Sequence, residues 1–251
     1  MIGEHELAAG FNSFWNEALP LLTPACVTVF NRSYGAYLEG FRPIDVELAL
    51  EGGTLRGPDL LAEVAFDVFR RAVTTGQRYR DVIEGHQYMD AWDTAVGVVQ
   101  RHRRVGDEAP PKSGSIAHRY LVALGRRYEA VAELYAPFEP RFSPLIGGCG
   151  FLGACEADIV SGDTLFEIKT VNRNFSSKDI RQVIIYLALK SLSGDSIWNR
   201  VVLFNPRRSF YANFEPKEFL TYVSAGKGVS QVFRELEALL LHRDFNPEHR
   251  F

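Results

Sequence analysis

The sequence has few cysteines and no long apolar run. It contains three cysteines in 251 residues, Cys26, Cys149 and Cys155, and no CxxC pair. Such a set argues against a disulfide framework and cannot fill a four-cysteine zinc or iron–sulfur site, so we expect a reducing, cytoplasmic setting. No stretch approaches about 18 uninterrupted apolar residues, which predicts no membrane span. The first residues lack a basic segment followed by an apolar run, so we expect no secretory signal.

An excess of positive charge is also absent, since the formal net charge is −3. Proteins that bind nucleic acid usually carry a basic surface, so any such surface here must be local. The charge argues mildly against tight, nonspecific binding of long duplexes. The six histidines do not cluster, and neither an HExxH pattern nor a GxSxG elbow occurs, which argues against a histidine-rich zinc site and against a serine-hydrolase elbow.

The N-terminal part of the chain has apolar residues at helical spacing. The predicted helices cover residues 4–19, 58–74 and 79–104. Residues 25–30, ACVTVF, are β-prone and predict a short strand. The segment VGDEAPPKSGS at 105–115 is polar, rich in Pro and Gly, and aperiodic, which indicates a linker or domain edge. We therefore expect a mostly helical N-terminal region, 1–111, and a second unit, 112–251.

From Ser115 onward the period of the apolar residues changes from helical to extended and back. Helices are predicted at 115–135, 176–192, 216–224 and 229–243. Extended segments are predicted at 138–146, 154–160, 164–171, 200–206 and 209–214, with a tight turn at 161–163. This order predicts an α/β fold with a mixed central sheet flanked by helices.

Charged residues lie on the predicted hairpin of 154–171. Glu167 and Lys169 are two residues apart, so they point to one side of the sheet, and Glu156 shares a side with Asp158 near the end of the other strand. Charges inside a β-rich run are costly unless they are paired or bind something. Two close carboxylates can hold Mg²⁺, which polarises a phosphate and activates water, and a neighbouring lysine can stabilise the developing charge. Alternatively, Glu167 and Lys169 are two exposed side chains of one strand that have no catalytic or binding role.

The stretch from about Phe142 to Arg207 resembles the PD-(D/E)XK nuclease superfamily. The matching segments are PLIGG at 144–148, EADIV at 156–160, LFEIKT at 165–170 and RQVIIY at 181–186. The last segment is similar to the Gln-x-x-x-Tyr motif of the RecB-like and lambda-exonuclease-like branch. Gln182 and Tyr186 are four residues apart, so they share one helix face.

The resemblance implies a restriction-endonuclease-like core over 112–251. It implies that Asp158 and Glu167 bind Mg²⁺ or Mn²⁺, that Lys169 is the catalytic lysine, and that Gln182 and Tyr186 orient DNA and the active site. Family members often add a glutamate from the preceding helix. Glu129 and Glu133 are both candidates here, and Glu129 is preferred. The chain departs from the pattern at residue 157, where Ala replaces the proline of the family.

Five basic residues follow the predicted strands of this core. They are Arg173, Lys178, Arg181, Arg207 and Arg208. Basic residues of this kind usually lie on a solvent-exposed face. Because these five follow the strands of the expected site in the chain, we hypothesise that they form a phosphate-binding rim.

The sequence thus favours a Mg²⁺-dependent nuclease that hydrolyses phosphodiester bonds, with DNA as the expected substrate, in repair, restriction or defence against mobile elements. One alternative is a noncatalytic subunit that keeps the nuclease fold and binds nucleic acid or a protein partner. Another is a helical partner-binding protein in which the α/β part is scaffold and no divalent metal binds. The N-terminal region has three candidate roles: positioning substrate, binding a protein partner, or self-association.

Overall fold

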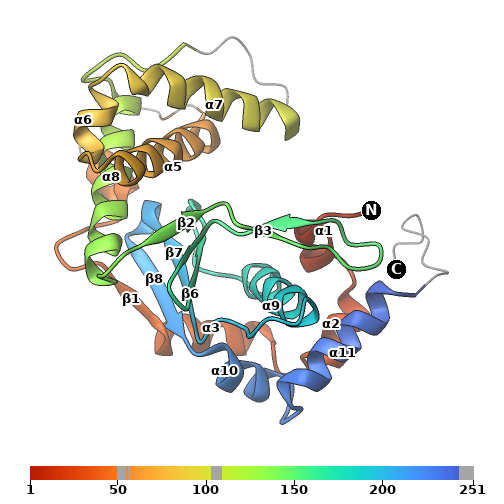
Figure 1. Ribbon diagram of the computed structural model, residues 1–251. Helices are drawn as coiled ribbons and strands as arrows, with labels where there is room; N and C mark the ends of the chain where they lie inside the picture. The colour runs from red at the N-terminus through yellow and green to blue at the C-terminus, as the bar shows by residue number, and fades with distance from the viewer. Residues whose placement is uncertain (50–54, 56, 103–108, 243–251) are drawn as a thin grey trace.

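A six-stranded sheet runs through the computed structural model, in the order β1-β8-β7-β6-β5-β2 (Figure 1). The structure describes residues 1–49, 55, 57–102 and 109–242. The strands are β1 (Gly35–Tyr37), β2 (Pro140–Phe142), β5 (Ile159–Ser161), β6 (Thr164–Ile168), β7 (Arg200–Asn205) and β8 (Phe210–Phe214). β6 and β7 are parallel and the other neighbours are antiparallel. The predicted α/β fold with a mixed sheet flanked by helices is confirmed.

Two further strands, β3 (Leu145–Ile146) and β4 (Cys155–Glu156), form a small separate hairpin. β5 and β6 join through a tight turn at Gly162, whose φ of 55° is in the left-handed region that glycine tolerates. β7 is buried along nearly its whole length because helices cover both faces of the sheet there.

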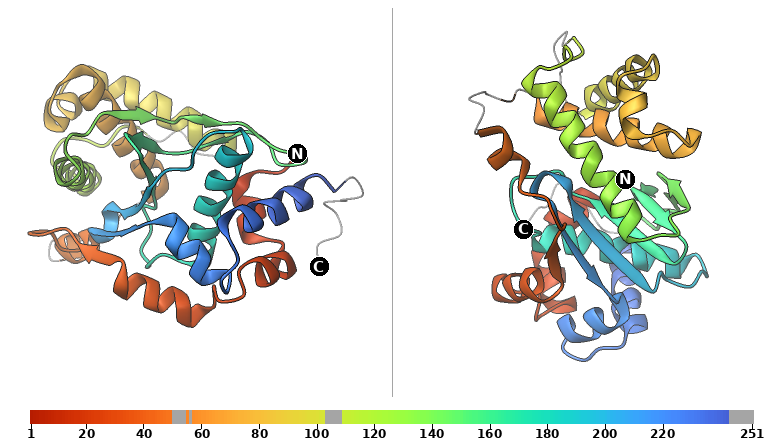
Figure 2. Two further views of the ribbon diagram at one scale, coloured as in Figure 1. Left: turned by 60° about the horizontal axis from the view of Figure 1, so that its bottom comes forward. Right: turned by 90° about the vertical axis from the view of Figure 1, so that its left-hand side faces the viewer.

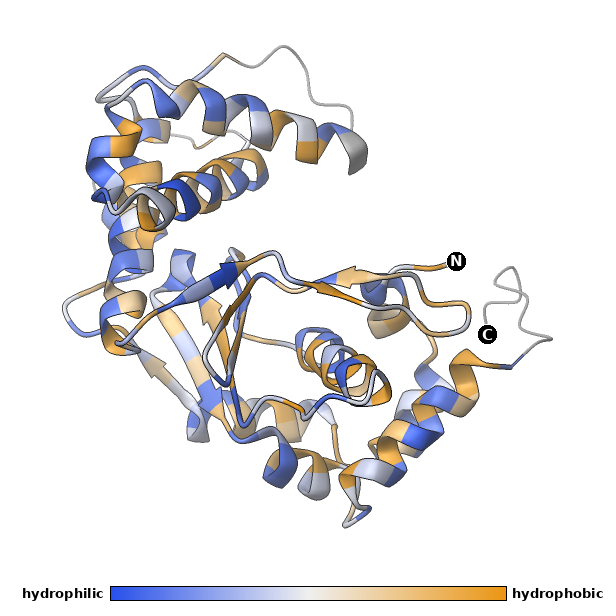
Figure 3. Cartoon of the chain, in the orientation of Figure 1, coloured by the Kyte–Doolittle hydropathy of each residue, from blue (hydrophilic) through white to orange (hydrophobic). Residues whose placement is uncertain are grey.

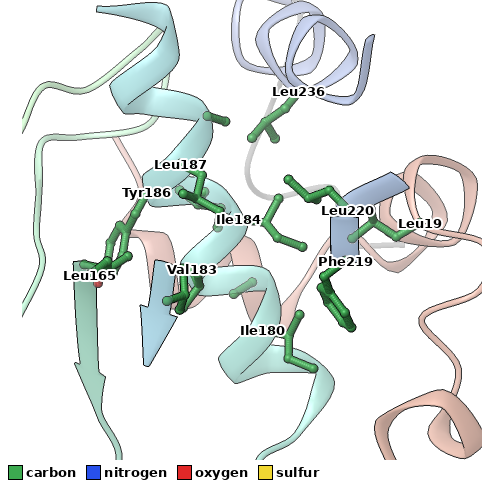
Figure 4. Close-up of a cluster of buried hydrophobic side chains, with 14 of the residues drawn as sticks. Leu19, Leu165, Ile180, Val183, Ile184, Tyr186, Leu187, Phe219, Leu220 and Leu236 are labelled. Carbon is green, nitrogen blue, oxygen red and sulfur yellow. The ribbon is translucent and has the colours of Figure 1, made fainter. Parts of the chain in front are cut away.

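One face of the sheet is covered by helices from both ends of the chain. They are α1 (Glu4–Ala9), α2 (Asn12–Ala18), α3 (Pro24–Ser33), α9 (Ser177–Leu192), α10 (Pro216–Val223) and α11 (Val229–Leu240). α9 is buried continuously from Asp179 to Leu189, since α1, α11 and the sheet surround it. Figure 4 shows its apolar side chains packed toward Leu165 of β6 and toward α10 and α11. α11 buries one stripe only, and Figure 3 shows hydrophobic and hydrophilic residues alternating around it.

The other face is covered by a helical layer, on the opposite side of the sheet from α9 (Figure 2). It consists of α4 (Ile44–Ala49), α5 (Pro58–Thr75), α6 (Tyr79–Ile83), α7 (Gln87–His102) and α8 (Ile116–Leu134). α5 packs against α7 and α8, while Tyr128 of α8 contacts Phe204 of β7. Within the ranges described, no helix has the length and apolarity needed to cross a membrane.

Residues on both sides of the predicted boundary at 111/112 contribute to the same cores. α1 packs on α9, β1 pairs with β8, and α5 packs on α8. The segment before the boundary therefore supplies an edge strand and helices to both faces of the sheet.

Several local predictions need correction. The strand predicted at 25–30 is wrong: these residues lie in α3, because Pro24 occupies the first turn and the Thr23 hydroxyl accepts a hydrogen bond from the Cys26 N–H. The helix predicted at 4–19 is two helices, separated at Phe11, whose φ is 54°.

The strand predicted at 154–160 is also divided, because the chain passes from β4 in the small hairpin to β5 in the large sheet. The strand predicted at 164–171 ends at Ile168, so Lys169 follows it directly. The predicted helix ends at 104 and 243 and part of the predicted linker at 105–115 lie outside the described residues.

Candidate active site

Two carboxyl groups meet at the end of β6. Glu167 is the penultimate residue of that strand, and Asp158 lies between β4 and β5, where the chain changes sheets. Asp158 Oδ2 accepts a hydrogen bond of 2.6 Å from the Ile168 N–H. This bond ties the Asp158 carboxyl to the backbone of the strand that carries Glu167, so the two acidic side chains are brought together.

The surroundings of these carboxyls disfavour their ionisation. Burial raises the pKa of Asp158 to about 6, while the Lys169 ammonium opposes the shift. Burial together with the charge of Asp158 raises the pKa of Glu167 to about 8. Glu167 is 2% exposed, and its Oε2 accepts no hydrogen bond from an N–H or O–H group of the described residues. A buried oxygen in this state is ready to bind a proton or a cation.

Lys169 begins a chain of hydrogen bonds that runs into α9. Its Nζ donates to Glu167 Oε1 at 2.7 Å and to Gln182 Oε1 at 2.5 Å. Gln182 Nε2 donates to the Tyr186 hydroxyl at 2.7 Å, and that hydroxyl donates to the Glu156 carbonyl at 3.2 Å. Burial acts to lower the pKa of Lys169, but the carboxylates of Glu167 and Asp158 outweigh it and raise that pKa, so the ammonium stays charged.

A cleft of about 930 Å³ reaches this group of side chains. Asp158, Lys169 and Thr170 line the side formed by the sheet, and residues of α5 and α7 line the opposite side. The cleft lies between α5 and α7 of the helical layer and the chain around β4 and the end of β6. Solvent and a ligand can therefore approach Asp158 and Lys169 through this cleft, whereas Glu167 is buried and does not line it.

A glutamate of another helix, Glu63 of α5, lines the cleft together with Asp158, and sequence reasoning missed it. Its charge raises the pKa of Asp158, and the pKa of Glu63 itself is raised by the protein around it and by Asp59 and Asp67, although solvent reaches it through the cleft. Asp59, Glu63 and Asp67 recur every four residues, so they form an acidic stripe on one face of α5. That spacing is the signal by which the sequence could have identified Glu63.

The two glutamates considered from the sequence lie elsewhere. Glu129 Oε1 accepts a hydrogen bond of 3.0 Å from the Tyr79 N–H, so it satisfies the first turn of α6. Glu133 is exposed near the end of α8, and neither residue lines the cleft. Glu63 of α5 thus lines the cleft with Asp158, whereas α8 contributes Tyr128 to the lining and neither Glu129 nor Glu133.

His5 of α1 is a second residue that sequence reasoning missed. It lines the cleft, and its Nε2 is 3.4 Å from Gln182 Nε2. A lone histidine near the start of the chain carries no sequence signal, and only the packing of α1 on α9 brings it here.

The five basic residues predicted to form a rim do not line the cleft. Arg181 is buried and contacts the Ala8 carbonyl, Asn12 and the Trp15 ring, so it holds α1 and α2 against α9. Arg173 pairs with Asp179, and Arg207 pairs with Asp45. Lys178 is exposed on α9 and Arg208 is half-buried. Three of the five, Arg173, Arg181 and Arg207, are thus either buried or paired with carboxylates of the protein.

The donors at the site fit a hard divalent cation. Among the described residues, no three His, Cys, Asp or Glu side chains gather into a ready metal cluster. Mg²⁺ is commonly held by one or two carboxylates, with water and substrate phosphate completing its shell. Asp158 and Glu167 match that requirement, and Glu167 Oε2 accepts from no N–H or hydroxyl group in the part of the chain that the structure describes, whereas a tetrahedral zinc site would need more protein ligands.

No protein-family model, curated protein or solved structure matches this chain. A function must therefore be argued from the site itself, which combines the buried carboxyl of Glu167, the half-buried carboxyl of Asp158, a charged lysine beside them, and a cleft lined by Asp158 and Lys169.

Proposed function

We propose that this protein is a metal-dependent nuclease of the PD-(D/E)XK type that hydrolyses phosphodiester bonds, with DNA as its substrate. The observation that carries the proposal is the convergence of Asp158, Glu167 and Lys169 at the end of β6, where Asp158 and Lys169 line a cleft. These three residues are the ones that the sequence resemblance assigns to metal binding and catalysis.

Each side chain of the site has a separate part in this chemistry. Asp158 and Glu167 would hold Mg²⁺ or Mn²⁺, and the bound ion would supply charge neutralisation and a more acidic water. Lys169 offers a fixed positive charge to the phosphate oxygens as negative charge develops on them. Gln182 fixes the Lys169 ammonium, and Tyr186 fixes Gln182, so the lysine is positioned before substrate binds.

A charge argument also supports a noncatalytic, partner-activated subunit as a second candidate. The formal net charge is −3, and the carboxylates that line the cleft outnumber its lysine and arginine residues. That candidate predicts binding of nucleic acid without cleavage. The hydrogen-bonded set of Glu167, Lys169 and Gln182 favours the catalytic proposal, because a buried ion pair is costly to retain without a use.

The test is cleavage of labelled single- and double-stranded DNA with Mg²⁺ or Mn²⁺. Wild type should cut, while Asp158→Ala and Lys169→Met should lose about 10²-fold or more of the rate, the scale of removing one group that stabilises the transition state. Lys217→Met is the matched control, since Lys217 is an exposed lysine outside the cleft, and it should keep wild-type activity. A wild type that cuts neither DNA nor RNA but binds one of them would favour the noncatalytic candidate.

A further inference from the structure

The two walls of the cleft differ in chemistry. The wall on the sheet side carries the site residues Asp158 and Lys169, with hydroxyls from Ser143 and Thr170. The opposite wall comes from α5 and α7, which lie above β3 in Figure 1. It combines the carboxylates of the α5 stripe with apolar side chains: Ala62, Phe66, Ala95 and Val98.

The lining has more acids than bases among the described residues. Its carboxylates are Asp59, Glu63, Asp67, Glu156 and Asp158, and its lysine and arginine residues are Lys169 and Arg70. Both of these cations already pair with carboxylates of the protein, Lys169 with Glu167 and Arg70 with Asp67. Asp67 is itself paired with Arg70 and Arg71, so Asp59 and Glu63 are the carboxylates that give the α5–α7 wall its negative charge. Such a wall disfavours phosphate groups, unlike the basic grooves that track a nucleic-acid backbone.

The same wall suits unpaired bases. Carboxylates accept hydrogen bonds from the amino groups of bases, as in their pairing with the N4 amino group of cytosine. Apolar and aromatic side chains favour the faces of bases. In a duplex the bases are already paired and both outer sides are lined by phosphates, whereas a single strand has one phosphate side and one base side.

The volume of the cleft agrees with a narrow ligand. About 930 Å³ falls within the roughly 300–1,000 Å³ of clefts that enclose one small molecule, so the cleft holds a short piece of one strand. A B-form duplex would meet the acidic wall with phosphates.

We propose that the substrate is single-stranded nucleic acid, bound with its phosphates toward Asp158 and Lys169 and its unpaired bases toward the α5–α7 wall. This inference rests on the proposed nuclease function and adds the substrate class to it. The acidic wall excludes duplex from the carboxyls and admits a strand that has been unpaired.

The experiment compares cleavage of one labelled oligonucleotide as a single strand and as a blunt duplex, with Mn²⁺. The single strand should be cut at least tenfold faster. Oligo-dC should be cut faster than oligo-dT, because thymine has no exocyclic amino group to donate to the carboxylates. Affinity is measured separately by fluorescence anisotropy with Lys169→Met, and it should show the same preferences.

A matched pair of variants tests the role of the wall. Val98→Arg adds a cation to the α5–α7 wall, so it should raise duplex cleavage and reduce the single-strand preference severalfold. Met89→Arg adds the same charge to the same helix at a side chain that is 49% exposed and outside the cleft, so the preference should stay as in wild type.

The possible failures are distinguishable. Duplex cleavage equal to or faster than single-strand cleavage overturns the inference and leaves the nuclease function standing. A preference that Val98→Arg does not change, or that Met89→Arg changes equally, also overturns it. Absence of cleavage on every substrate overturns the nuclease function and this inference together.

Discussion

At the scale of single residues, the burial of Glu167 costs the fold stability. Its carboxyl is almost wholly buried, one oxygen accepts from Lys169, and the other receives no N–H or O–H donor from the described residues. A buried polar group without a partner lowers the stability of the fold. A cation bound there would offset this cost, because a ligand that binds only the native state raises the free energy of unfolding.

Replacing Glu167 with Gln should therefore strongly reduce the stabilisation of the fold by a bound metal ion. In wild type, Mn²⁺ at about 100 times its dissociation constant should raise the free energy of unfolding by about 2.7 kcal/mol. Glu167→Gln removes a charged ligand and should respond much less. Thermal unfolding with and without Mn²⁺ measures this without any nucleic acid, and Glu235→Gln, outside the cleft, serves as the control. An equal response of Glu167→Gln and wild type would contradict the assignment of Glu167 as a ligand.

Gln182 and Tyr186 act on the site through Lys169. The Gln182 amide group uses its oxygen for the ammonium and its nitrogen for the Tyr186 hydroxyl. Burial raises the pKa of Tyr186 well above its ordinary value, so the hydroxyl stays protonated and donates to the Glu156 carbonyl. The network thus connects α9 to β4, beside Asp158, and these two residues are positioning residues.

At the scale of elements, the start of α9 fixes where the network begins. Asp179 in the first turn accepts hydrogen bonds from the N–H and hydroxyl of Ser176 and from Arg173. Burial alone would raise the pKa of Asp179, but these bonds outweigh it and the pKa is lowered. The side chain therefore stabilises the folded chain in its charged form and sets the position at which α9 starts, five residues before Gln182.

Asp179→Ala should lower the free energy of unfolding by about 1–2 kcal/mol at neutral pH, the scale of a lost helix cap. A carboxyl with a lowered pKa in the folded state contributes stability that is fully present above the ordinary Asp pKa of about 3.9. That contribution is lost as the pH falls through the folded-state value. Urea denaturation at pH 7 and near pH 3 should therefore show the difference between variant and wild type shrinking at low pH. A constant difference would mean that the charge of Asp179 has no part in it.

At the scale of the whole molecule, the segments before residue 112 complete the sheet and its cores. β1 covers the edge of β8, and α1 to α3 cover the face on which α9 packs. Asn31 of α3 also exchanges two hydrogen bonds with the backbone of Phe175, in the loop that leads to α9. The active-site helix is thus held in place by residues from the first third of the chain.

A fragment of residues 112–251 should therefore fail to fold cooperatively. It would expose the apolar face of α9 and leave Arg181 without its contacts to α1 and α2. Circular dichroism on heating should show a broad transition for the fragment and a sharp one for the full chain. A sharp transition in the fragment would mean that the N-terminal segments are an appendage. Residues 1–242 provide the control for truncation, because that fragment keeps every element of the sheet.

The sequence by itself determined the parts of the protein that depend on neighbours along the chain. The α/β order, the hairpin turn at Gly162, the two-residue spacing of Glu167 and Lys169, and the four-residue spacing of Gln182 and Tyr186 are all local, and the described elements agree with them. Periodicity fixes which side of one element a residue occupies, so these placements could be predicted.

Only the tertiary structure decided what faces the site across the cleft. Glu63 and His5 reach it through the packing of α5 over the sheet and of α1 on α9, and no short-range pattern encodes those contacts. Likewise, the sequence gives Arg181 and Arg207 the same expected role in a phosphate-binding rim. In the fold, Arg181 is buried under α1 and Arg207 is paired with Asp45. Charge and burial depend on distant partners, because a side chain meets its solvent or its counter-ion only when the whole chain has folded.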